Sequence, residues 1–534
     1  MKRNNFFSYV KNIILPCLVF SLLVGRFTGI FIMCYKWTVS QVINLSAKAF
    51  EFLRANPLWL LLAIPACAIP ALISSLLHKI APQSKGGGIA NALAFTRGLV
   101  TFKWLRTLIA TTFSSLMTFL FGTPLGNEGP SVLAGAAIGK GVVKLFGKNN
   151  RAWDRYAITG GACAGFAVAT NAPISGVLFS IEEAHHRISP MIIMVAGTTV
   201  AFAVACSQAF ANVIGVDANL FHALNPITLT LNEMWIPLLI GALCGLLSVL
   251  FIKTFELEHK FLRVVLKKIP ATLKMFITFA IFVLLGFASP LFIGTGHSII
   301  DQLFVGDIAV WLLVIAIVIR IIGICSAKNS GITGGTFIPV LALGAIFSSL
   351  IARLLIAIGL ISADYYQVVI LIGMSACFSG MTKTPLTAVA FAIEALALAS
   401  NVLHVLLAVI ISYMMTELFN TPTVNELSIE AQVEEYNHGK QEVIIDTFVT
   451  VKPNSFVVNK AIRDILWPNN LFVLSIKHAD STPRVDEHGE ALIKVGDMLH
   501  VRYSTFDKNR SKYELLNLVG EQDYVEYETR ETNE

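Results

Sequence analysis

The chain has 534 residues, of which 55% are hydrophobic and only 14% are charged, and its mean hydropathy is +0.70. A soluble globular domain carries about 25% charged residues, so this composition excludes an ordinary soluble protein and predicts an integral membrane protein. The net charge of +6 is unevenly shared, because residues 431–534 hold 18 acidic and 12 basic side chains. The basic excess of residues 1–430 is typical of cytoplasmic loops beside lipid headgroups, and we expect no nucleic-acid partner.

Apolar tracts follow one another along residues 1–430, several of them near the ~20 residues that a spanning helix needs. The first begins behind the basic start MKRNNFF and is longer than a signal peptide, so we expect a retained helix that starts in the cytoplasm. Glycine and proline interrupt other tracts, which leaves the number of spans open. All eight cysteines fall singly inside apolar tracts and are expected to be core thiols.

Three glycine motifs beside these tracts are each expected to begin a helix. They are Gly86-Gly87-Gly88-Ile89, then Gly126-Asn127-Glu128-Gly129-Pro130, and then Gly335-Thr336-Phe337-Ile338-Pro339. Pro130 and Pro339 suit a first helical turn, where no N–H is required. Irregular backbone at membrane depth is tolerated only where it is buried in protein or lines a cavity. Because a helix start offers free N–H groups and partial positive charge, three converging motifs predict an anion site made mainly of amides.

Glu128 is an ionisable group in the middle of an apolar tract. Near helix starts, its carboxylate could occupy the position of the anion and leave it on protonation, which would make one residue both a gate and a proton carrier. The alternative is a carboxylate at the membrane surface beside a helix N-terminus.

Two pairs of segments resemble each other in the same order. The segment 171–182 resembles 383–394, and the motif at Gly126 resembles the motif at Gly335. Such matches predict an internal duplication with a binding site between the halves. The alternative is a chance recurrence of small-residue packing patterns.

The chain resembles the CLC family of chloride channels and chloride/proton exchangers over roughly residues 10–425. GNEGP is similar to the family's G-(K/R)-E-G-P motif, GGTFIPVLALG to its G-x-F-x-P motif, and GGGIA stands in the place of G-S-G-I-P. NAPISGVLFSIEE is similar to the segment that carries an internal proton glutamate. The resemblance implies an all-α polytopic membrane protein with an internal inverted repeat, and a homodimer with one anion pathway in each subunit.

The resemblance also implies residue roles. Glu128 is expected to be the external gating glutamate and Glu183 the internal proton-transfer glutamate, with Glu182 as its structural neighbour. Gly87, Gly88 and the amides of Thr336 and Phe337 are expected to bind the anion, with the other motif residues completing the filter. Neither a metal, a cofactor nor catalytic residues are expected, since Glu182 to His186 lacks metal-ligand spacing and fits a membrane boundary better.

Four positions depart from the family pattern. Gly87 stands in place of serine and Ala90 in place of proline, Asn127 replaces a basic residue, and Val424 lies where a tyrosine would close the inner gate. Loss of the serine and tyrosine predicts a loose inner gate, and Asn127 resembles the fluoride/proton exchangers of the family. Channel-type members of the family usually lack an acid at the internal position, so the resemblance of both Glu128 and Glu183 to the family's carboxylates favours antiport. Chloride/proton antiport is the first expectation, with fluoride/proton exchange and a passive voltage- or pH-gated chloride channel as alternatives.

Beyond residue 430 the pattern changes to alternating apolar and polar residues, which predicts a small cytoplasmic α/β domain over 431–534 with a helix near 458–466. VVNKAIRDIL and KVGDMLHV resemble the TrkA-C domain of potassium-uptake regulators. That resemblance implies dimerisation and a small regulator, for example cyclic di-AMP, and the alternative is a structural dimer clamp. Together these features predict a multi-pass transporter of the bacterial type in the cell membrane.

Overall fold

The computed structural model describes most of the chain. The described residues are 10, 14–146, 151–215, 220–221, 224–265, 268–305, 308–453, 455–478, 489–520 and 525–531.

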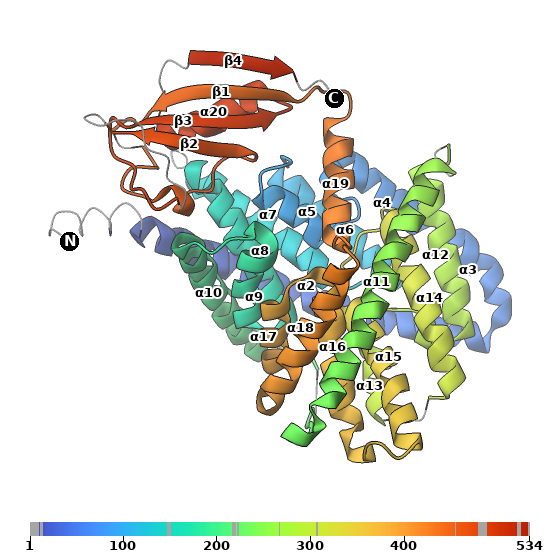
Figure 1. Ribbon diagram of the computed structural model, residues 1–534. Helices are drawn as coiled ribbons and strands as arrows, with labels where there is room; N and C mark the ends of the chain where they lie inside the picture. The colour runs from blue at the N-terminus through green and yellow to red at the C-terminus, as the bar shows by residue number, and fades with distance from the viewer. Residues whose placement is uncertain are drawn as a thin grey trace.

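A body of helices precedes a small sheet (Figure 1). The helices of the body are α2 (Leu15–Ala55), α3 (Leu60–Ala66), α4 (Ala68–Ile80), α5 (Ile89–Thr96), α6 (Trp104–Leu120), α7 (Glu128–Phe146), α8 (Asp154–Thr170), α9 (Pro173–Phe179), α10 (Pro190–Ile214), α11 (Trp235–Val264), α12 (Ala271–Ala288), α13 (His297–Val305), α14 (Val310–Asn329), α15 (Phe337–Ala357), α16 (Tyr366–Thr382), α17 (Pro385–Ala395), α18 (Val402–Leu418) and α19 (Val424–Asn437). Within the described residues, nine helical segments are long and apolar enough to cross a membrane. The chain is a multi-pass membrane protein, as the composition predicts.

The internal repeat is visible in two sets of three helices. α7, α8 and α9 correspond to α15, α16 and α17, and the members of each set follow one another in the same way. The two sets meet at an antiparallel bridge between Gly126 and Gly335, at the starts of α7 and α15. This arrangement confirms the inverted repeat.

The second helix of each set, α8 or α16, also ends in the same way. Asn171 directly follows α8 and Lys383 directly follows α16, both with left-handed backbone (φ 52° and 58°), and a proline begins the next helix two residues later. A left-handed residue ends a helix, and proline is accommodated in a first turn. The apolar tracts 157–181 and 366–396 are therefore each two helices rather than one span.

Small residues let the paired helices approach closely. A Cβ on Gly344 of α15 would lie 2.9 Å from the Gly373 carbonyl of α16, and a Cβ on Gly135 of α7 would overlap the Gly161 carbonyl of α8. Helix contacts in membranes commonly depend on such residues. These close contacts fix the orientation of α7 and α15, and with it the direction in which their N-terminal ends point.

The C-terminal region is a four-stranded antiparallel sheet in the order β2-β3-β1-β4, with one helix. Its elements are β1 (Val443–Thr450), β2 (Leu471–Lys477), β3 (Met498–Thr505), α20 (Lys508–Val519) and β4 (Val525–Glu531). Figure 1 shows the sheet at one end of the helical body, beyond the ends of α7 and α8. The alternation that predicted strands in this region is confirmed.

One secondary-structure prediction in this region is wrong. Instead of a helix near 458–466 there is only a single helical turn at Ile462–Asp464. The chain pairs with a neighbouring segment at Ala461 and Leu492, and Asn459 adopts left-handed backbone, which interrupts a helix. The predicted division at 430/431 stays a prediction, since α19 continues across it to Asn437.

Candidate functional site

Two of the three glycine motifs are joined directly by their backbones. The Gly126 amide donates to the Gly335 carbonyl and the Gly335 amide donates to the Gly126 carbonyl, both at 2.7 Å. Behind this bridge, Glu128 and Phe337 are the first residues of α7 and α15. The two helices therefore start side by side, deep in the body.

The third motif joins them. The Gly334 amide donates to the Gly87 carbonyl at 3.1 Å, and Gly88 immediately precedes α5. A Cβ on Gly129 would lie 2.6 Å from the Gly335 Cα and 2.9 Å from the Gly88 Cα. The three motifs are thus packed backbone to backbone, and only glycine fits at Gly129.

The remaining residues of the predicted filter take supporting positions. Gly86 has φ +67° and donates its amide to the Gly331 carbonyl at 3.0 Å, and Ile89 begins α5. Asn127 is buried, and its carbonyl accepts hydrogen bonds from the amide and the hydroxyl of Ser131. The Asn127 carbonyl thereby accepts the first backbone hydrogen bond of α7.

The two prolines of the repeat occupy equivalent positions: Pro130 is the third residue of α7 and Pro339 the third residue of α15, in the first helical turn as predicted. Thr336 directly precedes α15, and Ile338 is fully buried. The amides of a first helical turn have no partner inside their own helix, so the start of α15 offers free donors.

The Phe337 ring is held by aromatic neighbours. It makes edge contacts with Phe166, Phe378 and Phe391, at centroid distances of 5.2, 4.7 and 5.0 Å. Two of these rings, on α16 and α17, belong to the second half of the repeat, and Phe166, on α8, belongs to the first. Aromatic contacts of this kind are worth about 0.5–1.5 kcal/mol each beyond burial, so they fix the start of α15.

Glu128 is completely buried at the meeting point of the motifs. Within the described residues, neither of its carboxylate oxygens makes a hydrogen bond, although the amides of Glu128 and Ile338 and the more distant charge of Lys36 act on it. A Cβ on Gly126 would overlap the carboxylate. A buried carboxylate without a hydrogen bond is costly, and such groups mark functional sites in membranes.

Lys328 is a cation at this site that the sequence analysis missed. Its ammonium donates to the Gly86 carbonyl at 2.7 Å and to the Gly334 carbonyl at 3.3 Å. It lies 3.6 Å from the Cβ position of Gly88. Lys328 lies near the end of an apolar tract, and in sequence it is indistinguishable from an ordinary topology signal.

Glu183 is a second buried carboxylate, in the π-helical turn Ser180–His185 that follows α9 and is called the Glu183 turn below. The Asn425 side chain donates to its Oε1 atom. The Arg97 guanidinium donates to the backbone carbonyls of Glu183 and Ala184 at 2.8 and 3.0 Å, and pairs with Glu426 at 2.8 Å. Gly88 directly precedes α5 and Arg97 directly follows it. The helix α5 therefore connects the first glycine motif, at its N-terminal end, to the Glu183 turn, at its C-terminal end. Arg97 and Asn425 were not found from the sequence.

The residues next to Glu183 in the sequence contact different parts of the structure. The Glu182 carboxylate points to the start of α17, where it accepts the Thr387 amide at 2.7 Å. His185 contacts the Thr159 hydroxyl at 2.9 Å, whereas His186 lies beside Arg97. The two adjacent histidines thus face different partners.

Val424 is the first residue of α19 and is buried in the main core, next to Asn425. α19 packs against α5 and α16, so the predicted inner-gate position lies at the Glu183 end of the site.

Comparisons with known proteins identify a family and several similar proteins. The family described as Voltage gated chloride channel matches residues 69–417. The H(+)/Cl(-) exchange transporter ClcA of Vibrio cholerae serotype O1 is 29% identical over 418 residues, which cover 75% of this chain and 86% of that protein. The protein of the same name from Salmonella paratyphi A is 26% identical over 389 residues, covering 71% and 81%.

Solved structures show the same fold. A slow cyanobacterial Cl-/H+ antiporter aligns with a TM-score of 0.71 at 23% identity, covering 79% of this chain and 99% of that one. A CLC-type fluoride/proton antiporter aligns with a TM-score of 0.62 at 19% identity, covering 76% and 96%. With the three glycine motifs converging as described, these matches establish that the chain belongs to the CLC family of voltage gated chloride channels.

Proposed function

We propose that the protein is a secondary anion transporter that exchanges chloride for protons, with Glu128 as the gate. The observation that carries this proposal is the Glu128 carboxylate, buried without a hydrogen bond among the described residues, at three packed glycine motifs. Free amides at helix starts attract an anion, and an ionised Glu128 competes for the same place. Protonation removes that competition, so anion entry and proton uptake alternate.

Glu183 is proposed as the inner proton-transfer residue. It lies at the turn after α9, held by Asn425 and Arg97, and Val424 is nearby at the proposed inner gate. Two buried carboxylates in one subunit favour an exchanger over a channel, because a channel requires no second proton-carrying group. The exchangers among the similar proteins support the same proposal.

Fluoride/proton exchange is the second candidate. Gly87 supplies no hydroxyl and the side chain at 127 is a neutral amide, so the anion would be held mainly by backbone amides. Fluoride is the smallest halide and accepts the strongest hydrogen bonds from N–H donors, so a site made mainly of amides suits it.

Flux measurements on reconstituted protein test these proposals. In vesicles with an outward chloride gradient, uphill proton movement is expected. Anion movement without protons would reject both exchangers and leave the passive channel, whereas faster exchange of fluoride than of chloride would select the second candidate.

We propose that the sheet region lies in the cytoplasm. Arg263 of the basic segment 253–274 pairs with Glu434 of α19, and Lys85 pairs with Glu435 at 2.8 Å. Basic loops favour the cytoplasmic side, and these ion pairs support the same side for the C-terminal region. Labelling of a cysteine introduced at exposed Lys494 should require access from the cytoplasm.

A homodimer is proposed as well. Ile174 of α9 and Leu386 of α17 are exposed apolar residues at equivalent positions of the repeat, and Leu406 and Ile410 of α18 add to them. A symmetric dimer uses the same patch on both copies. Crosslinking through a cysteine at 386 should trap dimers, and a purely monomeric product would reject this assembly.

For the C-terminal region we also propose a TrkA-C-like domain that binds a small nucleotide regulator, for example cyclic di-AMP. This proposal is supported only by the resemblance of the sequence.

A further inference from the structure

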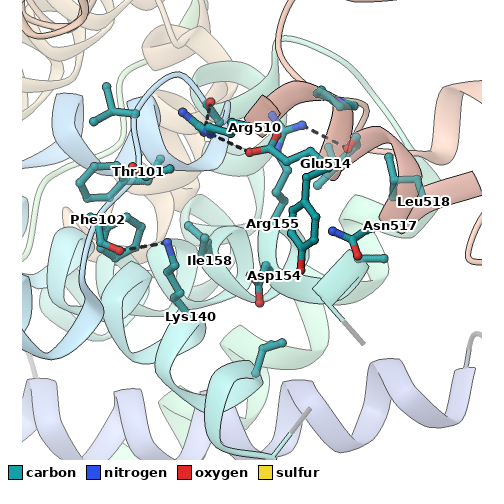
Figure 2. Close-up of a pocket in the computed structure, with 18 of the residues that line it drawn as sticks. Thr101, Phe102, Lys140, Asp154, Arg155, Ile158, Arg510, Glu514, Asn517 and Leu518 are labelled. Atoms are coloured by element: carbon teal, nitrogen blue, oxygen red, sulfur yellow. Dashed lines mark hydrogen bonds and ion pairs between the residues drawn. The ribbon is translucent and has the colours of Figure 1, made fainter. Parts of the chain in front are cut away.

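A cavity of about 600 Å³ lies between the sheet region and the helical body. Its walls come from α7 and α8, from the segment 98–102 after α5, and from α20 (Figure 2). This volume is typical of pockets for organic ligands and is far larger than a simple ion needs.

The walls of the cavity carry an excess of positive charge. Lys140, Lys144, Arg155 and Arg510 line it, against two carboxylates, Asp154 and Glu514. Figure 2 shows Lys140, Arg155 and Arg510 around the space, with the Lys140 ammonium bonded to the Phe102 carbonyl at 3.0 Å. The Glu514 carboxylate is engaged by Arg510 at 2.8 Å, which reduces its opposition to an anion.

Arg155 provides a second sign of a ligand site. Its Nε atom is buried and makes no hydrogen bond within the described residues. Its terminal nitrogens donate to backbone carbonyls on two sides, Leu466 and Trp467 of the sheet region and Arg97 of the body. A buried guanidinium N–H without an acceptor is unfavourable, and an anion in the cavity would satisfy it.

The rest of the lining is apolar and partly aromatic. Phe95, Phe102, Ile158, Pro468 and Leu518 border the space. Such surface suits the organic part of a ligand, whereas the cations suit phosphate, which arginine and lysine bind well.

The cavity is connected to Glu183 by a short series of hydrogen bonds. Arg155 donates to the Arg97 carbonyl, and the Arg97 side chain donates to the carbonyls of Glu183 and Ala184. A ligand that fixes Arg155 therefore also fixes the turn that carries Glu183.

We propose that this cavity binds a phosphate-bearing organic anion, and that its occupancy steadies the Glu183 turn through Arg155 and Arg97. The ligand is either a soluble nucleotide or the headgroup of an anionic lipid, which share the phosphate and an attached organic part. This inference goes beyond the anion exchange proposed above, and its binding test requires no transport activity.

Binding is tested on the full chain in nanodiscs of zwitterionic phosphatidylcholine, with ATP as the soluble probe and calorimetry as the readout. Lys140→Gln should weaken ATP binding about tenfold, since it removes a charge-assisted contact. Exposed Lys477, on β2 away from the cavity, gives the control variant Lys477→Gln, for which no change is expected.

A pair of opposite variants at exposed Asn517 separates binding from folding. Asn517→Glu should weaken ATP binding about threefold and Asn517→Lys should strengthen it about as much, because a folding defect would not reverse sign. Inorganic phosphate should bind more weakly than ATP in every variant.

The lipid source is tested by replacing phosphatidylcholine with phosphatidylglycerol. If the headgroup is the ligand, native mass spectrometry should show phosphatidylglycerol retained by the unmodified chain and by Lys477→Gln but lost from Lys140→Gln. Absence of binding by both probes, or binding that ignores both Lys140 and Asn517, would overturn the site. Bound ligand should also slow hydrogen exchange at residues 182–187, and unchanged exchange would overturn the link to Glu183.

Discussion

Glu182 and Glu394 each cap a helix in the opposite half of the repeat. The Glu182 carboxylate accepts the amide and the hydroxyl of Thr387 at the start of α17, both at 2.7 Å. The Glu394 carboxylate accepts the amide and the hydroxyl of Ser175 at the start of α9, at 2.9 and 3.0 Å. The exchange is reciprocal, so the two halves hold each other's helices in place.

Loss of either cap should destabilise the protein. Glu182→Gln and Glu394→Gln each replace charge-assisted bonds at a helix N-terminus by weaker neutral ones, at a cost of about 1–2 kcal/mol. Thermal unfolding of the full chain in detergent should show a lower Tm for both.

Proton coupling distinguishes this structural role from the role proposed for the next residue. Glu182→Gln should retain proton movement in reconstituted vesicles, whereas Glu183→Gln should lose much of it with little change in Tm. Loss of proton movement in Glu182→Gln but not in Glu183→Gln would assign proton transfer to Glu182 and the structural role to Glu183.

The convergence of the glycine motifs could be predicted from the sequence because glycine allows close backbone approach and proline restricts the backbone locally. The Gly126 and Gly335 motifs predicted helix starts, and the close contacts of Gly129 follow from the same residues. Arg97, Lys328 and Arg155 could not be found in this way. A cation at the end of an apolar tract satisfies the positive-inside pattern in any fold, and only the folded chain brings it to a particular carbonyl.

Substitution of Glu128 tests its proposed role as the gate. Glu128→Gln keeps the size of the side chain but removes its titration, so proton coupling should be abolished while anion movement continues. Parallel chloride and proton fluxes in vesicles measure both. Continued uphill proton movement in Glu128→Gln would remove Glu128 from the proton pathway.

Convergence of the three motifs depends on Gly129. In Gly129→Ala the new methyl group meets the Gly335 Cα at 2.6 Å and the Gly88 Cα at 2.9 Å, and backbone cannot easily move aside. Overpacking of this kind costs about 1–3 kcal/mol, and the displaced helix starts should also lose anion flux.

Gly197 in α10 provides the matched control, because its Cβ position has no heavy atom within 4 Å from the rest of the described residues, apart from its own helix backbone. Gly197→Ala should leave flux unchanged and raise stability by up to about 1 kcal/mol through helix propensity. Equal flux in the Gly129 and Gly197 variants would contradict the packing argument.

Lys328 should contribute to anion affinity. Its ammonium neutralises the Gly86 and Gly334 carbonyls beside the helix starts, so Lys328→Met should raise the KM for anion uptake about tenfold. Lys48, an exposed lysine of α2, gives the control variant Lys48→Met. An unchanged KM in Lys328→Met would mean that the amides bind the anion without help from this cation.

The C-terminal sheet region should show a pH dependence that comes from Lys460. This side chain is buried, its ammonium lies 3.4 Å from the Phe456 ring centroid, and burial lowers the pKa of Lys460 from 10.5 to about 7. Between pH 7 and 10.5 the unfolded chain therefore binds the proton that the folded chain has released, so stability rises as the pH increases through this window. Below pH 7 both states are protonated and the contribution no longer changes.

Scanning calorimetry of the full chain at pH 6.5, 8.5 and 10 measures this effect. The transition of the sheet region should move to higher temperature across the series in the unmodified chain and in the control Lys477→Met, because Lys477 is exposed. In Lys460→Met the rise should disappear, and the transition should lie higher at pH 6.5 because a buried charge is gone. A rise of the same size in Lys460→Met would assign the pH dependence to another group.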